Sequence, residues 1–275
     1  NLSDTLGTDL GTVTITQSAG VTFSTISIAT VALTDTSGDV TFNGNVTLTS
    51  LTTASQDYNV IFNGSSNTIT NAVTFSNSGT LTFGNGSGDS STFNAGLTTT
   101  APSQINIGGT LETSNDAMSL GDSDTAIVLV ANTTLNTGSA ALTLNATVNG
   151  GYTLTLNSTD ATTFAGVVGG STALTGINTN ASGTVVFNTT AIETNGDQLY
   201  RENATIGGDI TFTTGDNDLT FSGTVNSVSS TKTLDIVAGS GDVTFSGTVG
   251  GSEALGNTTI GVAGLTVGAI KVQGT

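Results

Sequence analysis

The sequence predicts an all-β protein, an elongated right-handed parallel β-helix of about 11 to 13 coils that forms one solenoid domain over residues 1–275. Three observations predict it. The composition suits strands and not helices, apolar and polar residues alternate in short runs, and one short motif recurs along the chain.

The composition is that of a sheet protein with many tight turns. Its 275 residues include 37 glycines and 1 proline but no tryptophan or cysteine, and most polar positions hold threonine, serine or asparagine. Branching at Cβ restricts side-chain freedom in a helix and suits a pleated surface, so the abundant threonine and valine predict strands. The regular placement of the 35% hydrophobic residues indicates a buried core and argues against disorder.

Short alternating runs follow one another from the beginning of the sequence. A period of two residues is the signal of a strand with one buried face. Clusters of Gly, Asn, Asp and Ser, such as residues 63–67, separate the runs and predict turns, because these residue types tolerate positive φ. The clearest runs are Val13–Ile15, Val21–Phe23, Val46–Leu48, Val60–Phe62, Leu142–Leu144 and Leu154–Leu156.

The segment 241–255 contains the recurring motif, Thr-Phe-x-Gly-x-Val-Gly-Gly followed by Ala-Leu. Residues 163–174 repeat most of it, and residues 38–46, 208–212 and 218–225 repeat parts. The repeats are best defined over 160–275 and looser over 1–100, so the motif is interpreted as one coil's inward strand and turn. The predicted structural core of the repeat is Phe42, Phe164, Phe212, Phe221, Val243, Phe245 and Leu255.

Phenylalanines recur at steps that suit one coil of two or three short strands. Like side chains would then stack from coil to coil at the strand spacing of about 4.8 Å. The step is irregular between Phe62 and Phe93 and is lost from there to Phe164. The two regular series are Phe23, Phe42 and Phe62, and then Phe164, Phe187 and Phe212.

A tandem array of β-sandwich modules is the alternative architecture, since strands at regular spacing with Gly-rich turns also fit it. The absence of tryptophan and the ladder-like repetition favour the β-helix. Pro102 is the only proline and no Pro/Ser-rich linker divides the chain, so the sequence predicts no domain boundary.

Net charge and the length of the apolar runs exclude two classes of partner, nucleic acid and the membrane interior. The net charge is −17, and Arg201, Lys232 and Lys271 are the only cationic side chains, so the chain cannot neutralise nucleic-acid phosphates. The longest apolar run, Ala126–Ala131, is far shorter than the roughly 20 residues of a membrane-spanning helix, so no membrane insertion is expected.

The residues offer little material for catalysis, and we expect no enzyme. Without His or Cys the chain lacks the usual general base and thiol nucleophile, and its Ser and Thr have no His to activate them. Paired carboxylates could support a polysaccharide-active β-helix enzyme, which is a remote alternative. The candidate pairs are Asp122 with Asp124 and Asp216 with Asp218, each in a Gly-Asp-x-Asp turn.

The same four aspartates are weak candidates for Ca²⁺ ligands, because Ca²⁺ prefers clustered carboxylate and carbonyl oxygens. Aspartates at such positions also serve simply as turn formers. No other cofactor is expected.

The motif resembles the repeats of a known protein family. Together with residues 194–200 and 205–212, it is similar to the repeats of bacterial filamentous-haemagglutinin-like and autotransporter-type extracellular β-helix proteins. The resemblance implies an extracellular or bacterial cell-surface location and a fibre-forming or adhesive role. It implies no catalytic residues.

The expected function is structural. The sequence predicts a turn and a strand in residues 1–17 and a strand in residues 262–272, with no capping helix or polar cap at either end. Unpaired strand edges are templates for pairing with a strand of another chain. We therefore expect head-to-tail association with copies of itself, through the uncapped ends or by donation of a terminal strand, into a surface fibre or stalk. The alternative is an adhesin module that binds glycans or host or abiotic surfaces, whose signature would be exposed aromatic side chains, drawn here from Tyr58, Tyr152 and Tyr200.

Overall fold

The computed structural model describes residues 10–229 and 231–270, and the side chains up to residue 261. The chain divides into two compact units, Asn1–Ala140 and Ala141–Thr275. Both consist of parallel strands, the described part contains no helix, and the two units together hold about 12 turns of β-solenoid. The predicted parallel β-helix is confirmed, and the sandwich alternative, which needs antiparallel sheets, is wrong.

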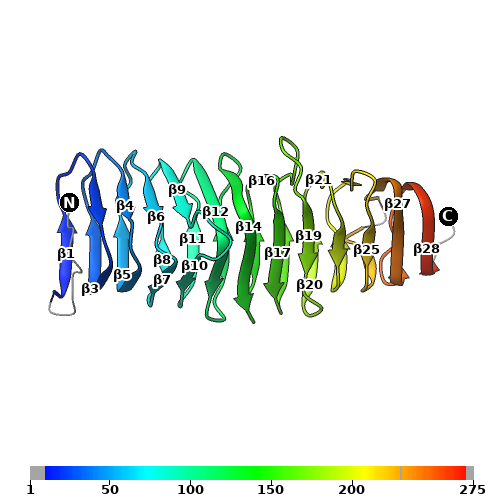
Figure 1. Cartoon of the computed structure of the whole chain (residues 1–275). Coiled ribbons are helices and arrows are strands. Elements are labelled where there is room, and N and C mark those ends of the chain that lie inside the picture. The colour runs from blue at the N-terminus through cyan, green and yellow to red at the C-terminus, as the bar shows by residue number, and fades with distance from the viewer. Residues whose placement is uncertain (1–9, 230, 271–275) are drawn as a thin grey trace. The chain divides into compact units, whose positions relative to one another are not determined.

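In the first unit, strands that follow one another along a coil belong to three parallel stacks, and each strand pairs with its counterpart one coil away. Figure 1 shows these strands side by side, in blue to green. The first stack contains β2 (Val21–Phe23), β4 (Val40–Phe42), β6 (Val60–Phe62), β9 (Thr80–Phe83) and the first halves of β12 (Gln104–Thr113) and β14 (Ala126–Gly138). The second contains the first halves of β3 (Ile26–Leu33) and β5 (Val46–Thr53), then β7 (Ser66–Ile69), β10 (Ser90–Phe93) and the second halves of β12 and β14. The third contains β1 (Thr12–Ile15), the second halves of β3 and β5, β8 (Val73–Thr74), β11 (Leu97–Thr99) and β13 (Met118–Leu120).

The second unit repeats this plan with three stacks of its own. One contains β17 (Thr153–Ser158), β19 (Gly176–Thr179), β22 (Gln198–Tyr200), β25 (Leu219–Phe221) and the middle of β27 (Leu234–Val249). Another contains β15 (Leu142–Leu144), β18 (Ala161–Phe164), β20 (Thr184–Phe187), β23 (Asn203–Ile206), β26 (Val225–Ser227) and the end of β27. The last contains β16 (Thr147–Asn149), β21 (Ala191–Glu193), β24 (Ile210–Thr213) and the start of β27, and β28 (Thr258–Ile270) pairs along β27.

The core of the first unit contains a row of stacked phenylalanine rings. The Phe23 and Phe42 ring centroids lie 4.9 Å apart, and those of Phe42 and Phe62 lie 4.8 Å apart, which is the predicted coil-to-coil stacking. The irregular step after Phe62 has a simple cause. Phe83 is the next member of this row, while Phe93 belongs to the second stack.

In the second unit one step of the predicted phenylalanine series is wrong. Phe164 stacks on Phe187 as expected, with ring centroids 5.6 Å apart. Phe187, however, is in register with Ile206. Phe212 lies on another stack, and its ring is nearly perpendicular to that of Phe187, with the two ring centroids 5.0 Å apart. Several inward faces give the same alternating pattern, so spacing alone could not assign Phe212 to its face.

The two longest copies of the motif also lie on different stacks. Phe164 is in β18, whereas Phe245 is in β27 and stacks on Phe221 with ring centroids 5.4 Å apart. In both copies the following glycine turns the corner: a Cβ at Gly166 or Gly247 would lie 2.0 or 2.4 Å from a backbone oxygen of the preceding coil. The motif therefore specifies a corner and not one fixed face.

The predicted core residues are buried with one exception. Phe42, Phe164, Phe212, Phe221, Val243 and Phe245 are all in the core. The prediction for Leu255 is wrong, because this residue is half-buried in the turn between β27 and β28, where it enters no stack.

The strands predicted near the two ends of the sequence are present within the described residues. β1 lies inside segment 1–17, and β28 continues to Ile270. Residues 1–9, Lys271 and Val272, which also belong to those predictions, lie outside the described residues.

The stacked ring row predicts the effect of Phe42→Ala. The ring is fully buried between Phe23 and Phe62, so its removal leaves a cavity and should destabilise the chain by about 3–5 kcal/mol in denaturant unfolding. The control is Thr41→Ala on the outward side of the same strand, which should change stability by less than about 0.5 kcal/mol. Equal effects would contradict the stacking.

Close approach at corners predicts that Gly64→Ala is destabilising. An added Cβ would lie 2.3 Å from the Gly44 oxygen, and relief of that overlap should cost about 1–3 kcal/mol. Gly88→Ala is the matched control, since its Cβ would meet nothing within 4 Å. Chemical denaturation of both variants compares them, and a Gly64→Ala variant as stable as Gly88→Ala would contradict the corner geometry.

Candidate functional site

The first predicted aspartate pair lies in the turn between β13 and β14. The Asp122 Oδ1 accepts hydrogen bonds from the backbone N–H of Asp124 at 3.0 Å and of Thr125 at 3.1 Å, and from the Thr125 hydroxyl at 3.0 Å. These bonds, with that of Asp124 the strongest, hold the pKa of Asp122 below its usual value. The Asp122 carboxylate therefore shapes its own turn.

The second pair lies between β24 and β25 and reaches the next coil. The Asp216 Oδ1 accepts a hydrogen bond from the Ser240 N–H at 3.0 Å, and the Asp218 Oδ1 accepts one from the Asp242 N–H at 2.8 Å. Asp216 also has a positive φ of 68°. Both carboxylates thus bind backbone groups at coil corners.

The contact made by Asp216 and Asp218 recurs along the chain. An Asn or Asp Oδ1 accepts a hydrogen bond from a backbone N–H one coil later, at corners where the strand ladder is interrupted. This contact gives such N–H groups a partner. It joins Asn45 to Ser66, Asn59 to Thr80, Asn115 to Ser139, Asn203 to Thr224, Asp209 to Thr233 and Asn226 to Ser252.

The carboxylates do not converge on a metal centre in the described residues. Within residues 10–229 and 231–270, no group of three or more acidic side chains is placed to hold a metal ion. Asp122 and Asp124 belong to the first unit, and Asp216 and Asp218 to the second. A Ca²⁺ ion at either pair would need backbone carbonyl oxygens or water as its further ligands.

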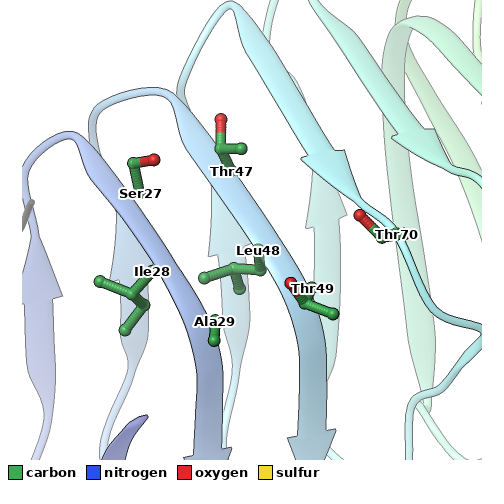
Figure 2. A pocket seen from close by; sticks show the side chains of 7 residues that line it. All are labelled: Ser27, Ile28, Ala29, Thr47, Leu48, Thr49 and Thr70. Carbon is green, nitrogen blue, oxygen red and sulfur yellow. The ribbon is translucent and has the colours of Figure 1, made fainter. Parts of the chain in front are cut away.

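The surface hollows of the described residues include two of about 280 Å³ each. The first crosses neighbouring coils where β3 and β5 bend, as Figure 2 shows, and is lined by Ser27, Ile28, Ala29, Thr47, Leu48, Thr49 and Thr70. The second, in the other unit, is lined by Thr153, Thr175, Gly176, Ile177, Asn178, Asp197 and Leu199. The first has no titratable side chain and the second has one carboxylate, so neither lining provides an acid–base pair for catalysis.

The three tyrosines expected to form an adhesive surface differ in exposure. Tyr58 is buried, and its hydroxyl oxygen accepts a hydrogen bond from the Ala54 N–H at 3.0 Å. Tyr200 is buried and donates to the Gln198 Oε1 at 3.1 Å. Only Tyr152, at 39% exposure, presents its side chain to solvent. The three tyrosines therefore form no exposed aromatic cluster.

The structure shows a polar corner at residues 200–203 that was not predicted from the sequence. Glu202 is 3% exposed, and it is the only charged side chain among the buried residues of the described part of the chain. It occupies the corner position that Gly223 and Gly247 occupy in the next two coils. The available signal was the substitution of Tyr-Arg-Glu-Asn for the Phe-Ser-Gly-Thr found at 221–224 and 245–248.

The outermost described strand of the first unit has an open side. In the described residues, β1 pairs with β3 and with no other strand. Val13 and Ile15 of β1 are only half-buried, whereas their partners in β3, Val31 and Leu33, are 0% and 1% exposed. The inward row of this stack is therefore incompletely covered at β1.

The sequence matches no protein-family model, and neither the curated proteins nor the solved structures yield a match. The β-solenoid repeat architecture rests on the structure itself, and the haemagglutinin or autotransporter type rests on the motif resemblance alone. Across the described residues, no helix has the length and apolar character needed to cross a membrane.

The corner contact predicts that Asp218 stabilises the fold as a hydrogen-bond acceptor and not through its negative charge. Asp218→Ala loses the acceptor for the Asp242 N–H and should lower the free energy of unfolding by up to about 1 kcal/mol, whereas Asp218→Asn keeps an acceptor and should stay close to wild type. Thermal melts with Ca²⁺ and with chelator test the metal hypothesis on the same proteins. A Ca²⁺-dependent rise in the wild-type melting temperature that both variants lose would show that the charge binds metal.

Proposed function

We propose that this chain is a structural subunit of a bacterial extracellular or cell-surface fibre or stalk, which associates head to tail with copies of itself. The incompletely covered inward row of β1 is the observation that carries the proposal. The resemblance of the motif to surface-protein repeats supports the location. The proposal assigns the chain no catalytic role.

Backbone pairing supplies the directional part of such an association. One edge of β1 pairs with β3, and no described strand pairs with its other edge, where a further parallel strand could bind N–H and C=O groups. Coils within each unit already join in this way, strand on strand. A strand from a second copy would continue the same ladder.

Burial of apolar side chains supplies the stabilising part. Val13 and Ile15 would lose their remaining contact with water under a further coil, as Val31 and Leu33 have done beneath β1. Apolar area removed from water is worth roughly 25 cal/mol per Å². Each new coil would in this way complete the row that the previous coil left open.

Net charge opposes association and sets its salt dependence. Each copy has a net charge of −17, so approaching copies repel one another. At physiological ionic strength exposed charges are screened beyond about 8 Å, so assembly should be favoured by added salt.

Adhesion is a second candidate function, and the exposed Tyr152 and the hydroxyl-lined hollows favour it. Tyrosine rings and hydroxyls are amphipathic or polar groups suited to a wet interface. Glycan-array binding by a non-assembling variant would support adhesion independently of fibre formation.

The proposal predicts opposite results for two lysine variants of adjacent residues. Val13 lies on the inward row and Thr14 points outward, so Val13→Lys places a charge in the stacking surface and Thr14→Lys adds the same charge outside it. Sedimentation velocity and electron microscopy at rising protein concentration should show assembly for wild type and Thr14→Lys, and monomers for Val13→Lys. Dispersed wild-type monomers, or unchanged assembly of Val13→Lys, would contradict the proposal.

A further inference from the structure

Glu202 and Arg201 together hold the end of the strand that precedes them in the stack. The Glu202 Oε2 accepts a hydrogen bond from the Thr179 hydroxyl, which in turn accepts one from the Arg201 N–H at 3.1 Å. The Arg201 Nη1 donates to the Thr179 carbonyl oxygen at 2.7 Å and to the Asn178 side-chain oxygen. Two consecutive residues of one coil therefore clamp the end of β19 in the coil before it.

The other carboxyl oxygen of Glu202 has no such partner. Oε1 is buried and has no hydrogen-bond partner. A charged carboxylate with one unpaired oxygen out of water is costly, and a protonated carboxyl is much less so. The geometry thus suits a neutral Glu202.

Few charges act on this carboxyl. The neighbouring β19, β25 and β26 contain no titratable side chain, so Arg201 and the buried phenol of Tyr200 are the titratable groups that interact with it. Burial raises the pKa of Glu202, and the hydrogen bond from Thr179, those from nearby backbone N–H groups and the Arg201 charge oppose that rise only in part.

We propose that Glu202 is a proton-operated latch between two coils of the second unit, closed while the carboxyl carries its proton and opened when it ionises. On ionisation, Oε1 would acquire charge without a donor, and water must enter the corner to solvate it. Entry of water there separates the end of β19 from residues 201–202 and breaks the contacts of the Thr179 hydroxyl.

The direction of the pH effect follows from linkage. The pKa of Glu202 is higher in the folded chain than in the unfolded chain, where it is about 4.3, so the folded state holds the proton more tightly. The stability that protonated Glu202 gives to the folded chain is fully present below the pKa of the unfolded chain. It is lost as pH rises through the pKa of the folded chain. The latch therefore loosens toward neutral and alkaline pH.

Glu202→Gln tests the latch because an amide resembles the protonated carboxyl and cannot ionise. Thermal unfolding midpoints from pH 4 to pH 8 should coincide for wild type and Glu202→Gln at the acid end, and the variant should melt progressively above wild type as pH rises. Glu253→Gln, an exposed position with the same change of charge, is the matched control and should show no such divergence. A difference that stays constant across pH, or an equal divergence for Glu253→Gln, would overturn the proposal.

Amide exchange in the wild-type protein gives a second readout that needs no variant. After correction for the intrinsic pH dependence, exchange at Arg201, whose N–H binds the Thr179 hydroxyl, should accelerate with pH more than exchange in β26. Parallel acceleration in both places would also overturn the latch.

Discussion

The coil-to-coil backbone ladder is the constraint on which the rest of this structure depends. Parallel pairing at about 4.8 Å places each residue over its counterpart in the next coil. Equivalent residues of successive coils therefore form a continuous row along the solenoid. A row must accept the same kind of side chain many times. Phe23, Phe42 and Phe62 satisfy this inside, and glycines satisfy it at corners where a Cβ would strike the previous coil's backbone.

Corners are where the ladder stops and where the chain must find other partners for its N–H groups. The Asn and Asp side chains supply them, each from one coil to the next. This explains why acids and amides follow or precede strands so regularly in the sequence. Asp216 and Asp218, which look like ligands in sequence, are explained by the same requirement.

The fold could be predicted from the sequence because period-two alternation and phenylalanine steps both follow from the ladder. The register could not, since several inward faces produce the same alternation. Phe212 therefore lies on a face other than the one its spacing predicts, although it is buried as predicted.

The candidate site was harder to predict. The sequence placed Asp218 in a turn, but its hydrogen-bond partner Asp242 lies 24 residues away. This pairing could be predicted only from the coil register, which the sequence did not determine. The burial of Glu202 could not be predicted from the sequence, because a charged side chain in a polar turn is normally exposed to water. Only its alignment with Gly223 and Gly247, which the structure supplies, shows that the corner encloses it.

The scarcity of charge follows from the same row principle. Two like charges about 4 Å apart repel by about 1 kcal/mol even in bulk water, and stacking repeats that penalty along a row. Asp197, Asp218 and Asp242 nevertheless form such a row. The first two each accept a backbone N–H from the following coil, which offsets part of the repulsion. Threonine and asparagine meet the need for outward polarity without this penalty, and only 8% of the residues are charged.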